Sequence, residues 1–158
     1  MGLVLIAVSA ITIQSVAYYF YQNMYTHDAS KSAVLCRGID ASCIRVSTLI
    51  NYGNNSVVWH NVSDVPSTWN FYQLTVQIAN VDSTSFSFGH LVTSVDGVHA
   101  SGSSYWRLWI FCGPKSAWFY SPVGADSLNL ADGSSFAWAL QSDPSQPPIS
   151  GEAIVDSC

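Results

Sequence analysis

The sequence predicts an α+β fold, with a long hydrophobic N-terminal α-helix followed by a compact β-rich head that contains one helix. Residues 1–23 carry no charged side chain and are apolar on every side of a helical projection, which is typical of a helix buried all round. Further along, β-branched segments alternate with turns, and residues 68–79 have apolar side chains at helical spacing. We therefore expect a hydrophobic helix over residues 1–31 and a globular head over residues 32–158.

Four interpretations of the N-terminal stretch are open. A secretory signal peptide would use Ser15-Val16-Ala17 as its cleavage site, but no Lys or Arg precedes Lys31, whereas signal peptides begin with a positive region. A membrane anchor fits the length, because about 20 residues at about 1.5 Å each span roughly 30 Å. A hairpin buried within the head fits poorly with so long and uniformly apolar a stretch. The fourth interpretation is a helix packed against identical helices in a filament.

We favour the filament interpretation, because a helix that is apolar on every side must be surrounded, and one small head cannot surround it. The stretch is uncharged and rich in Ile, Val and Ala with scattered Ser and Thr, and about its first thirty residues resemble the N-terminal helix of archaeal type IV pilins. Bacterial pilins usually carry Glu at the fifth mature position, where this chain has Leu5. The residues expected to pack between subunits are Leu3, Leu5, Ile6, Val8, Ile11, Ile13, Gln14, Val16 and Phe20.

The composition restricts the partners that the chain can have. Charged residues make up 9% of it and the net charge is −5, against roughly 25% charged residues in ordinary soluble domains. The five Lys and Arg are spread along the sequence, so they predict no basic patch for nucleic acid or anionic lipid. The polar surface must come from Ser, Thr, Asn and Gln, as suits an extracellular protein, and sequons at Asn54 and Asn61 predict N-glycosylation.

Four cysteines are present, at Cys36, Cys43, Cys112 and Cys158. They allow three pairings, and sequence alone does not choose among them. We favour Cys36–Cys43, which would close a short turn-rich loop, together with Cys112–Cys158, which would fix the last residue. Four buried free thiols are the alternative. Disulfides would indicate an oxidising, extracellular setting, and scattered His residues without a C-x-x-C pair argue against zinc.

The head is expected to form a sheet of five or so strands with one helix laid across it. Residues 105–112 are nearly all large and should form a central strand. The helix should begin after Ser67 as its N-cap. A hairpin of residues 128–130 and 134–140 should close the sheet. The remaining strands are expected at residues 44–51, 56–62, 83–88, 91–95, 117–120 and 149–155. Residues 44–51 alternate, so that Ile44, Val46, Thr48 and Ile50 face one way, and this strand should form a hairpin with residues 56–62.

Several short motifs of the head resemble the transcobalamin C-terminal-like domain, a family largely of unknown function found in secreted and surface proteins. The motifs are Val92–Gly97, Tyr105-Trp106 followed by Gly113, Gly124-Ala125-Asp126, and Asp132-Gly133 before Trp138. The resemblance covers about residues 44–140 and implies a compact, β-grasp-like fold. Cobalamin binding in transcobalamin also needs a large helical domain, and these 158 residues encode none.

No catalytic motif is present: the sequence has no nucleophile elbow, no Gly-rich phosphate loop and no H-x-x-x-H pair. We therefore expect neither an enzyme nor a bound cofactor. The favoured function is a structural subunit of an extracellular, archaeal pilus-like filament, made of identical copies whose partner before assembly is the membrane. The alternative is a membrane-anchored surface domain that binds a small ligand or a cobalamin-like cofactor in a concave aromatic pocket lined by Trp106, Trp109, Trp118 or Trp138.

Overall fold

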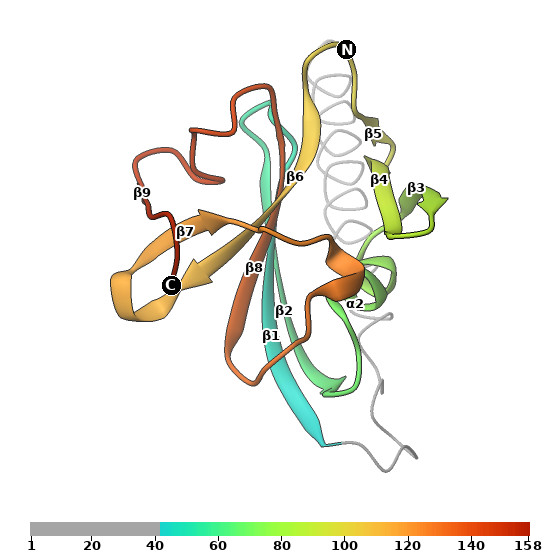
Figure 1. The fold of residues 1–158 in the computed structure, drawn as a ribbon, viewed down its shortest axis with the longest axis vertical. Coiled ribbons are helices and arrows are strands. Elements are labelled where there is room, and N and C mark those ends of the chain that lie inside the picture. The colour runs from blue at the N-terminus through green and yellow to red at the C-terminus, as the bar shows by residue number, and fades with distance from the viewer. Residues whose placement is uncertain (1–41) are drawn as a thin grey trace, which may run out of the picture. The chain divides into compact units, whose positions relative to one another are not determined.

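The computed structural model describes residues 42–158, which form two β-sheets and one α-helix (Figure 1). The larger sheet has six strands in the order β2-β1-β8-β6-β7-β9, and the smaller has three in the order β3-β4-β5. The larger sheet comprises β1 (Cys43–Asn51), β2 (Val57–Pro66), β6 (Tyr105–Cys112), β7 (Ala117–Tyr120), β8 (Ser134–Gln141) and β9 (Ala153–Ile154). The remaining elements are α2 (Phe71–Ile78), β3 (Val81–Phe86), β4 (Gly89–Val95), β5 (Val98–His99) and the short 3-10 helices η1 (Gly113–Lys115) and η2 (Ala125–Ser127).

The predicted fold class is wrong. The described residues are β-rich, with nine strands in two sheets rather than one sheet of about five, and their one α-helix, α2, has eight residues. No long apolar helix occurs among them. The stretch over residues 1–31, with its predicted assembly positions, lies outside the described residues.

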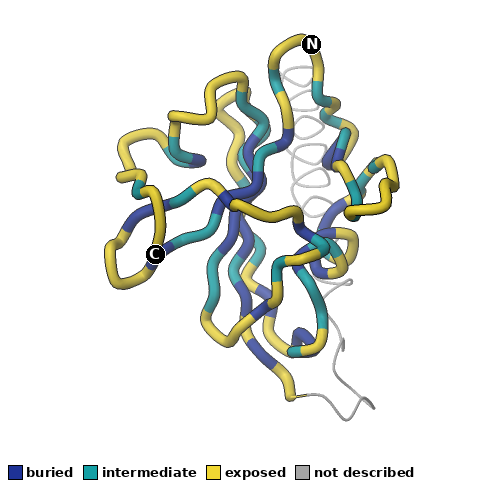
Figure 2. Tube along the Cα trace, in the orientation of Figure 1, coloured by how far each residue is buried: buried dark blue, intermediate teal, exposed yellow. Residues whose placement is uncertain are grey.

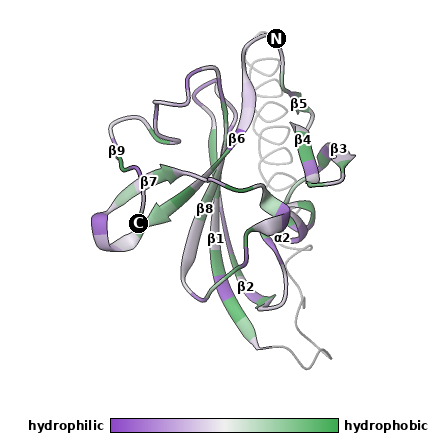
Figure 3. Cartoon of the chain, viewed as in Figure 1, coloured by the Kyte–Doolittle hydropathy of each residue, from purple (hydrophilic) through white to green (hydrophobic). Residues whose placement is uncertain are grey.

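The hairpin of β1 and β2 forms as predicted, antiparallel and joined by the turn at residues 52–56. The start of β1 alternates between hydrophobic and hydrophilic residues (Figure 3), and Ile44, Val46 and Ile50 are buried on one face. This face packs against side chains of α2, β4, β6 and β8 to form the main core, which Figure 2 shows as dark blue. The alternation of residues in β1 therefore predicts correctly which side chains share a face of this strand.

The other face of the larger sheet carries a second, smaller core that the alternation did not predict. Leu49 lies on that face and is fully buried with Trp109, Trp118, Ala137 and Ala139. Phe111 and Ile149 pack against them. Strands covered on both faces are apolar at consecutive positions, as in the run Leu49-Ile50.

Helix α2 is confirmed by the structure, but it begins later than predicted. Its N-cap is Asn70, whose side-chain oxygen accepts from the backbone N–H of Gln73 at 2.9 Å, while the Gln73 side chain accepts from the Asn70 N–H at 3.0 Å. A reciprocal capping box needs Glu or Gln three residues after the cap. Gln73 meets that requirement for Asn70, whereas the residue three after Ser67 is Asn70 itself.

The predicted last hairpin is wrong. Residues 128–130 are not a strand, and β8 instead pairs parallel with β1 and antiparallel with β6. Strand β6 is interior as predicted, and β9 supplies a two-residue edge strand parallel to β7. The parallel partner of β8 precedes it by about 90 residues, and short-range patterns carry no information on such a pairing.

Candidate functional site

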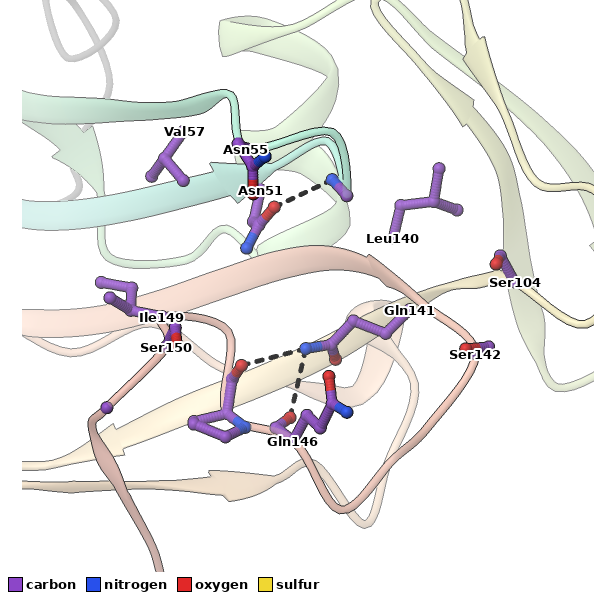
Figure 4. A pocket seen from close by; sticks show the side chains of 13 residues that line it. Asn51, Asn55, Val57, Ser104, Leu140, Gln141, Ser142, Gln146, Ile149 and Ser150 are labelled. Carbon is purple, nitrogen blue, oxygen red and sulfur yellow. Dashed lines mark hydrogen bonds between the residues drawn. The ribbon is translucent and has the colours of Figure 1, made fainter.

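A groove of about 560 Å³ lies between the turn after β1, the end of β8 and the segment at residues 142–151 (Figure 4). Residues 51–57 and 140–151, which are distant in sequence, meet there because β1 and β8 are parallel neighbours and end on the same side, and Ser104 completes the lining. The lining residues are Asn51, Gly53, Asn55, Val57, Ser104, Leu140, Gln141, Ser142, Gln146, Pro147, Ile149, Ser150 and Gly151.

Two amide side chains hold the outer wall of the groove against the sheet. The Gln141 amide donates to the carbonyl oxygens of Gln146 and Pro147, at 3.1 and 3.0 Å (Figure 4), and its oxygen accepts from the indole N–H of Trp109 at 3.1 Å. Asn51 donates to the carbonyl oxygen of Pro148 at 2.6 Å. These amides satisfy carbonyl groups of a loop without regular structure, which fixes the loop's position over the sheet.

The end of the chain is also tied down. Cys112 and Cys158 form a disulfide with their Cα atoms 5.3 Å apart, the pairing favoured from the sequence. The indole N–H of Trp118 donates to Glu152, and the backbone N–H of Val155 donates to the Trp118 carbonyl oxygen. Cys43 is also disulfide-bonded, and its predicted partner Cys36 lies outside the described residues.

The chemistry of the groove is neutral. None of its lining residues is charged, and its side chains combine amides and hydroxyls with the apolar surfaces of Val57, Leu140 and Ile149. Asn55 and Gln146 line the groove and are exposed, and within residues 42–158 their side-chain amides make no hydrogen bond. Amides and hydroxyls both donate and accept hydrogen bonds, so the groove suits an uncharged ligand with several polar groups.

The predicted aromatic pocket does not form. Trp106 and Trp138 are buried in the main core, and Trp109 and Trp118 in the second core. None of these four indoles lines the groove. Their N–H groups are bonded within the head: Trp106 donates to the Val98 carbonyl oxygen at 3.0 Å. Buried indoles satisfied in this way serve packing.

A second polar cluster joins β4 to η2. Both carboxylate oxygens of Asp126 accept from His90, one from its backbone N–H and one paired with ring Nδ1, each at 2.7 Å. The ring of Tyr72 stacks on the His90 ring at a centroid distance of 4.0 Å. Gly89 leaves room for the carboxylate, because a Cβ there would lie 2.7 Å from an Asp126 oxygen, and its φ of +124° disfavours other residues. The tight packing indicates a structural joint.

This cluster predicts a pH dependence of stability. Burial raises the pKa of the Asp126 carboxyl, but the hydrogen bonds from His90 outweigh burial and hold that pKa below its ordinary value of 3.8. A carboxyl with a lowered folded-state pKa stabilises the fold above its unfolded-state pKa, and this contribution is lost as the pH falls through the folded-state pKa. The stability advantage of wild type over Asp126→Asn, measured by urea unfolding, should therefore shrink as the pH falls below 3.8. An advantage that does not change with pH would refute the assignment.

The structure also bears on the predicted glycosylation sites, on metal binding and on membrane-spanning helices. Asn54 and Asn61 are both exposed, in the turn after β1 and on β2, and their glycosylation stays a prediction. Among residues 42–158, no three His, Cys, Asp or Glu side chains gather as metal ligands. In the same range, no helix combines the length and the apolar composition needed to cross a bilayer.

The described residues thus define a β-rich fold of two sheets, with a disulfide-bonded C-terminal segment over one face of the larger sheet. No protein-family model and no curated protein matches the chain. The fold is similar to part of haptocorrin, solved in complex with Cbi, with a TM-score of 0.51 and 18% identity over 65% of this chain. This match spans 26% of the haptocorrin chain. A protein from Ruminococcus gnavus ATCC 29149 that is proposed to bind metal matches with a TM-score of 0.47 and 15% identity, over 62% of this chain and 96% of that protein.

The haptocorrin likeness supports the fold that the motifs of the head suggested, at the level of chain architecture. One of these motifs, Gly124-Ala125-Asp126, places the Asp126 carboxylate within hydrogen-bonding distance of His90. Gly89, which has no side chain, leaves room for that carboxylate. The predicted resemblance to pilins concerns the N-terminal stretch, outside the described residues.

Proposed function

We propose that the chain is an extracellular binding domain that holds a small uncharged ligand in the groove of Figure 4. The observation that carries this proposal is the groove itself: a hollow of about 560 Å³ with a fixed outer wall and no charged lining residue. Its volume lies within the range of small-molecule sites, roughly 300–1,000 Å³. Its wall is held by hydrogen bonds from Gln141 and Asn51, so little ordering is needed when a ligand binds.

Two further observations support this proposal. The Cys112–Cys158 disulfide is of the kind that persists in oxidising, extracellular compartments. The fold occurs in haptocorrin, whose structure was solved in complex with Cbi. A cobalamin-like compound is therefore a reasonable first probe.

Filling the groove tests the proposal. Ser142 lines the groove and is exposed, so Ser142→Trp should place an indole in the space without disturbing a buried contact. In a ligand-observed NMR screen of small neutral compounds, binders of the full chain should lose their signal with Ser142→Trp. The matched control is Ser87→Trp, at an exposed serine between β3 and β4, and it should keep binding. Equal binding by both variants would reject the groove as the site.

A second candidate function, a structural subunit of an extracellular filament, is favoured by an apolar patch. Phe86, Phe88 and Leu91 form this hairpin-tip patch, and all three are exposed, Phe88 by 75%. The rings of Phe86 and Phe88 stack at 5.1 Å, and residues 83–91 carry no Lys, Arg, Asp or Glu. The outer edge of β3 is unpaired within the described sheet. An uncharged apolar patch beside an open edge is suited to contact with another copy.

This candidate predicts that the hairpin-tip patch controls assembly. Phe88→Ser should shift the full chain toward monomer in sedimentation velocity and shorten or abolish filaments in negative-stain micrographs, because it removes the most exposed apolar side chain of the patch. Tyr120→Ser, at an exposed aromatic residue on β7, is the control and should leave assembly unchanged. A wild-type chain that stays monomeric at all concentrations would exclude assembly through the head.

A further inference from the structure

An exposed indole lies on β2, two residues from the lining of the groove. Val57 lines the groove, and Trp59 lies two residues further along the same strand. Side chains two positions apart in a strand point to the same face, roughly 7 Å apart. The register agrees, since Asn51 pairs with Val57 and Leu49 with Trp59 across β1 and β2. Trp59 therefore lies on the face that carries the groove.

Trp59 differs from the four indoles buried in the cores. It contacts Trp118 at a ring-centroid distance of 6.5 Å, yet 46% of its surface is exposed. Packing on Trp118 from one side fixes the ring and leaves much of it open to solvent. Strand β2 is at the edge of the larger sheet, so no neighbouring strand of the described chain restricts access. A fixed, exposed aromatic ring beside a polar groove is a stacking surface.

The groove and Trp59 together match the chemistry of a neutral saccharide. A pyranose ring presents C–H groups on its faces, which pack on an aromatic ring, and hydroxyls at its edge, which both donate and accept hydrogen bonds. Asn55 and Gln146 offer side-chain amides with both capacities. Charged ligands are disfavoured, because their charge would lose hydration without gaining a partner. Arg107 donates to the carbonyl oxygens of Gln141 and Ser142 but does not line the groove.

We propose that the ligand is a neutral oligosaccharide, with one sugar ring stacked on Trp59 and the next residues hydrogen-bonded in the groove. This inference rests on the proposed function, because it names the ligand class of the same groove. Asn51 and Gln141 are wall supports, since their amides are already bonded to the loop carbonyls. The exposed amides of Asn55 and Gln146, unbonded within residues 42–158, are left for the ligand.

Isothermal titration calorimetry on the unglycosylated full chain tests the inference. The probes are cellohexaose and maltohexaose as neutral oligosaccharides, hexagalacturonate as an acidic one, and N-acetyl-tetraalanine amide as a neutral non-sugar. We expect a neutral oligosaccharide to bind and the acidic one to bind at least about tenfold more weakly. Trp59→Ala should weaken binding about tenfold, and Trp59→Tyr should restore most of it. Phe88→Ala, an exposed aromatic residue elsewhere, should have no effect.

Other outcomes separate the inference from the function on which it rests. The peptide probe could bind, with its binding blocked by Ser142→Trp and unchanged by Trp59→Ala. That result would overturn the assignment of a saccharide ligand but keep the groove as the binding site. Oligosaccharide binding that survives Ser142→Trp would overturn both. If neither cellohexaose nor maltohexaose binds, the assignment of a saccharide ligand is overturned. The small-molecule screen then decides whether the groove is a binding site. Circular dichroism of each variant shows that a loss of binding is not a loss of folding.

Discussion

Replacing Phe71 with alanine is expected to lower the free energy of unfolding by about 3–5 kcal/mol. Phe71 is the first residue of α2 and is fully buried, with its ring 4.7 Å from that of Phe136 and 5.8 Å from that of Trp138. It thus joins the helix to β8, and its truncation leaves a cavity between rigid rings that cannot close. Urea unfolding of the full chain, followed by tryptophan fluorescence, measures the change.

Val76→Ala is the matched control for Phe71→Ala. Val76 is on the same helix but is exposed, so its truncation should change the stability by less than about 0.5 kcal/mol. Alanine is also the better helix former of the two. Similar losses at both positions would mean that α2 does not pack on β8 through Phe71, and the main core would need a different description.

The second large effect is expected from the disulfide. Replacing both Cys112 and Cys158 by serine should destabilise the chain by about 4 kcal/mol, because the bridge closes a loop over 46 residues that is otherwise free in the unfolded state. Replacing both cysteines avoids leaving one free thiol. Urea unfolding measures the loss, and reduction of the wild-type chain should move it in the same direction.

The same double variant tests the link between the disulfide and the groove. The segment at residues 142–151 is also held by Gln141 and Asn51, so the groove should persist with weaker ligand binding rather than disappear. Gln141→Leu removes the bonds to the Gln146 and Pro147 carbonyl oxygens and should weaken binding more than the loss of the disulfide does. A double cysteine variant as stable as wild type would show that the C-terminal segment contributes little to the fold.

Local patterns predicted local structure well and distant pairing poorly. The alternation in β1, the hairpin to β2 and the helix near Phe71 follow from side-chain periodicity within about ten residues. The parallel pairing of β1 with β8 joins Val46 to Ser134, and no short motif encodes such a contact. Residues 128–130 were predicted as a strand from their sequence, but in the fold the Leu128 carbonyl oxygen accepts from the Phe71 N–H at 2.9 Å. A tertiary contact with α2 thus replaces the predicted pairing.

The groove could not be predicted from the sequence for the same reason. Its lining comes from three separate segments, and residues 143–148 resemble an ordinary Pro-rich surface loop. The aromatic residues also gave an ambiguous signal, because composition does not distinguish the buried Trp109 from the exposed Trp59. One available signal was the position of Trp59, on an outward-facing site of a predicted strand, where core packing does not account for a large apolar ring.

The central claim is that the groove beside β1, β8 and residues 142–151 is the ligand site of this chain. Amide chemical-shift mapping of the isotope-labelled full chain, titrated with its tightest-binding small neutral compound, tests this claim most directly. The largest shifts should fall in residues 51–59 and 140–151, the segments that line the groove and carry Trp59. Shifts concentrated instead at the hairpin-tip patch of Phe86, Phe88 and Leu91, or around His90 and Asp126, would contradict the account.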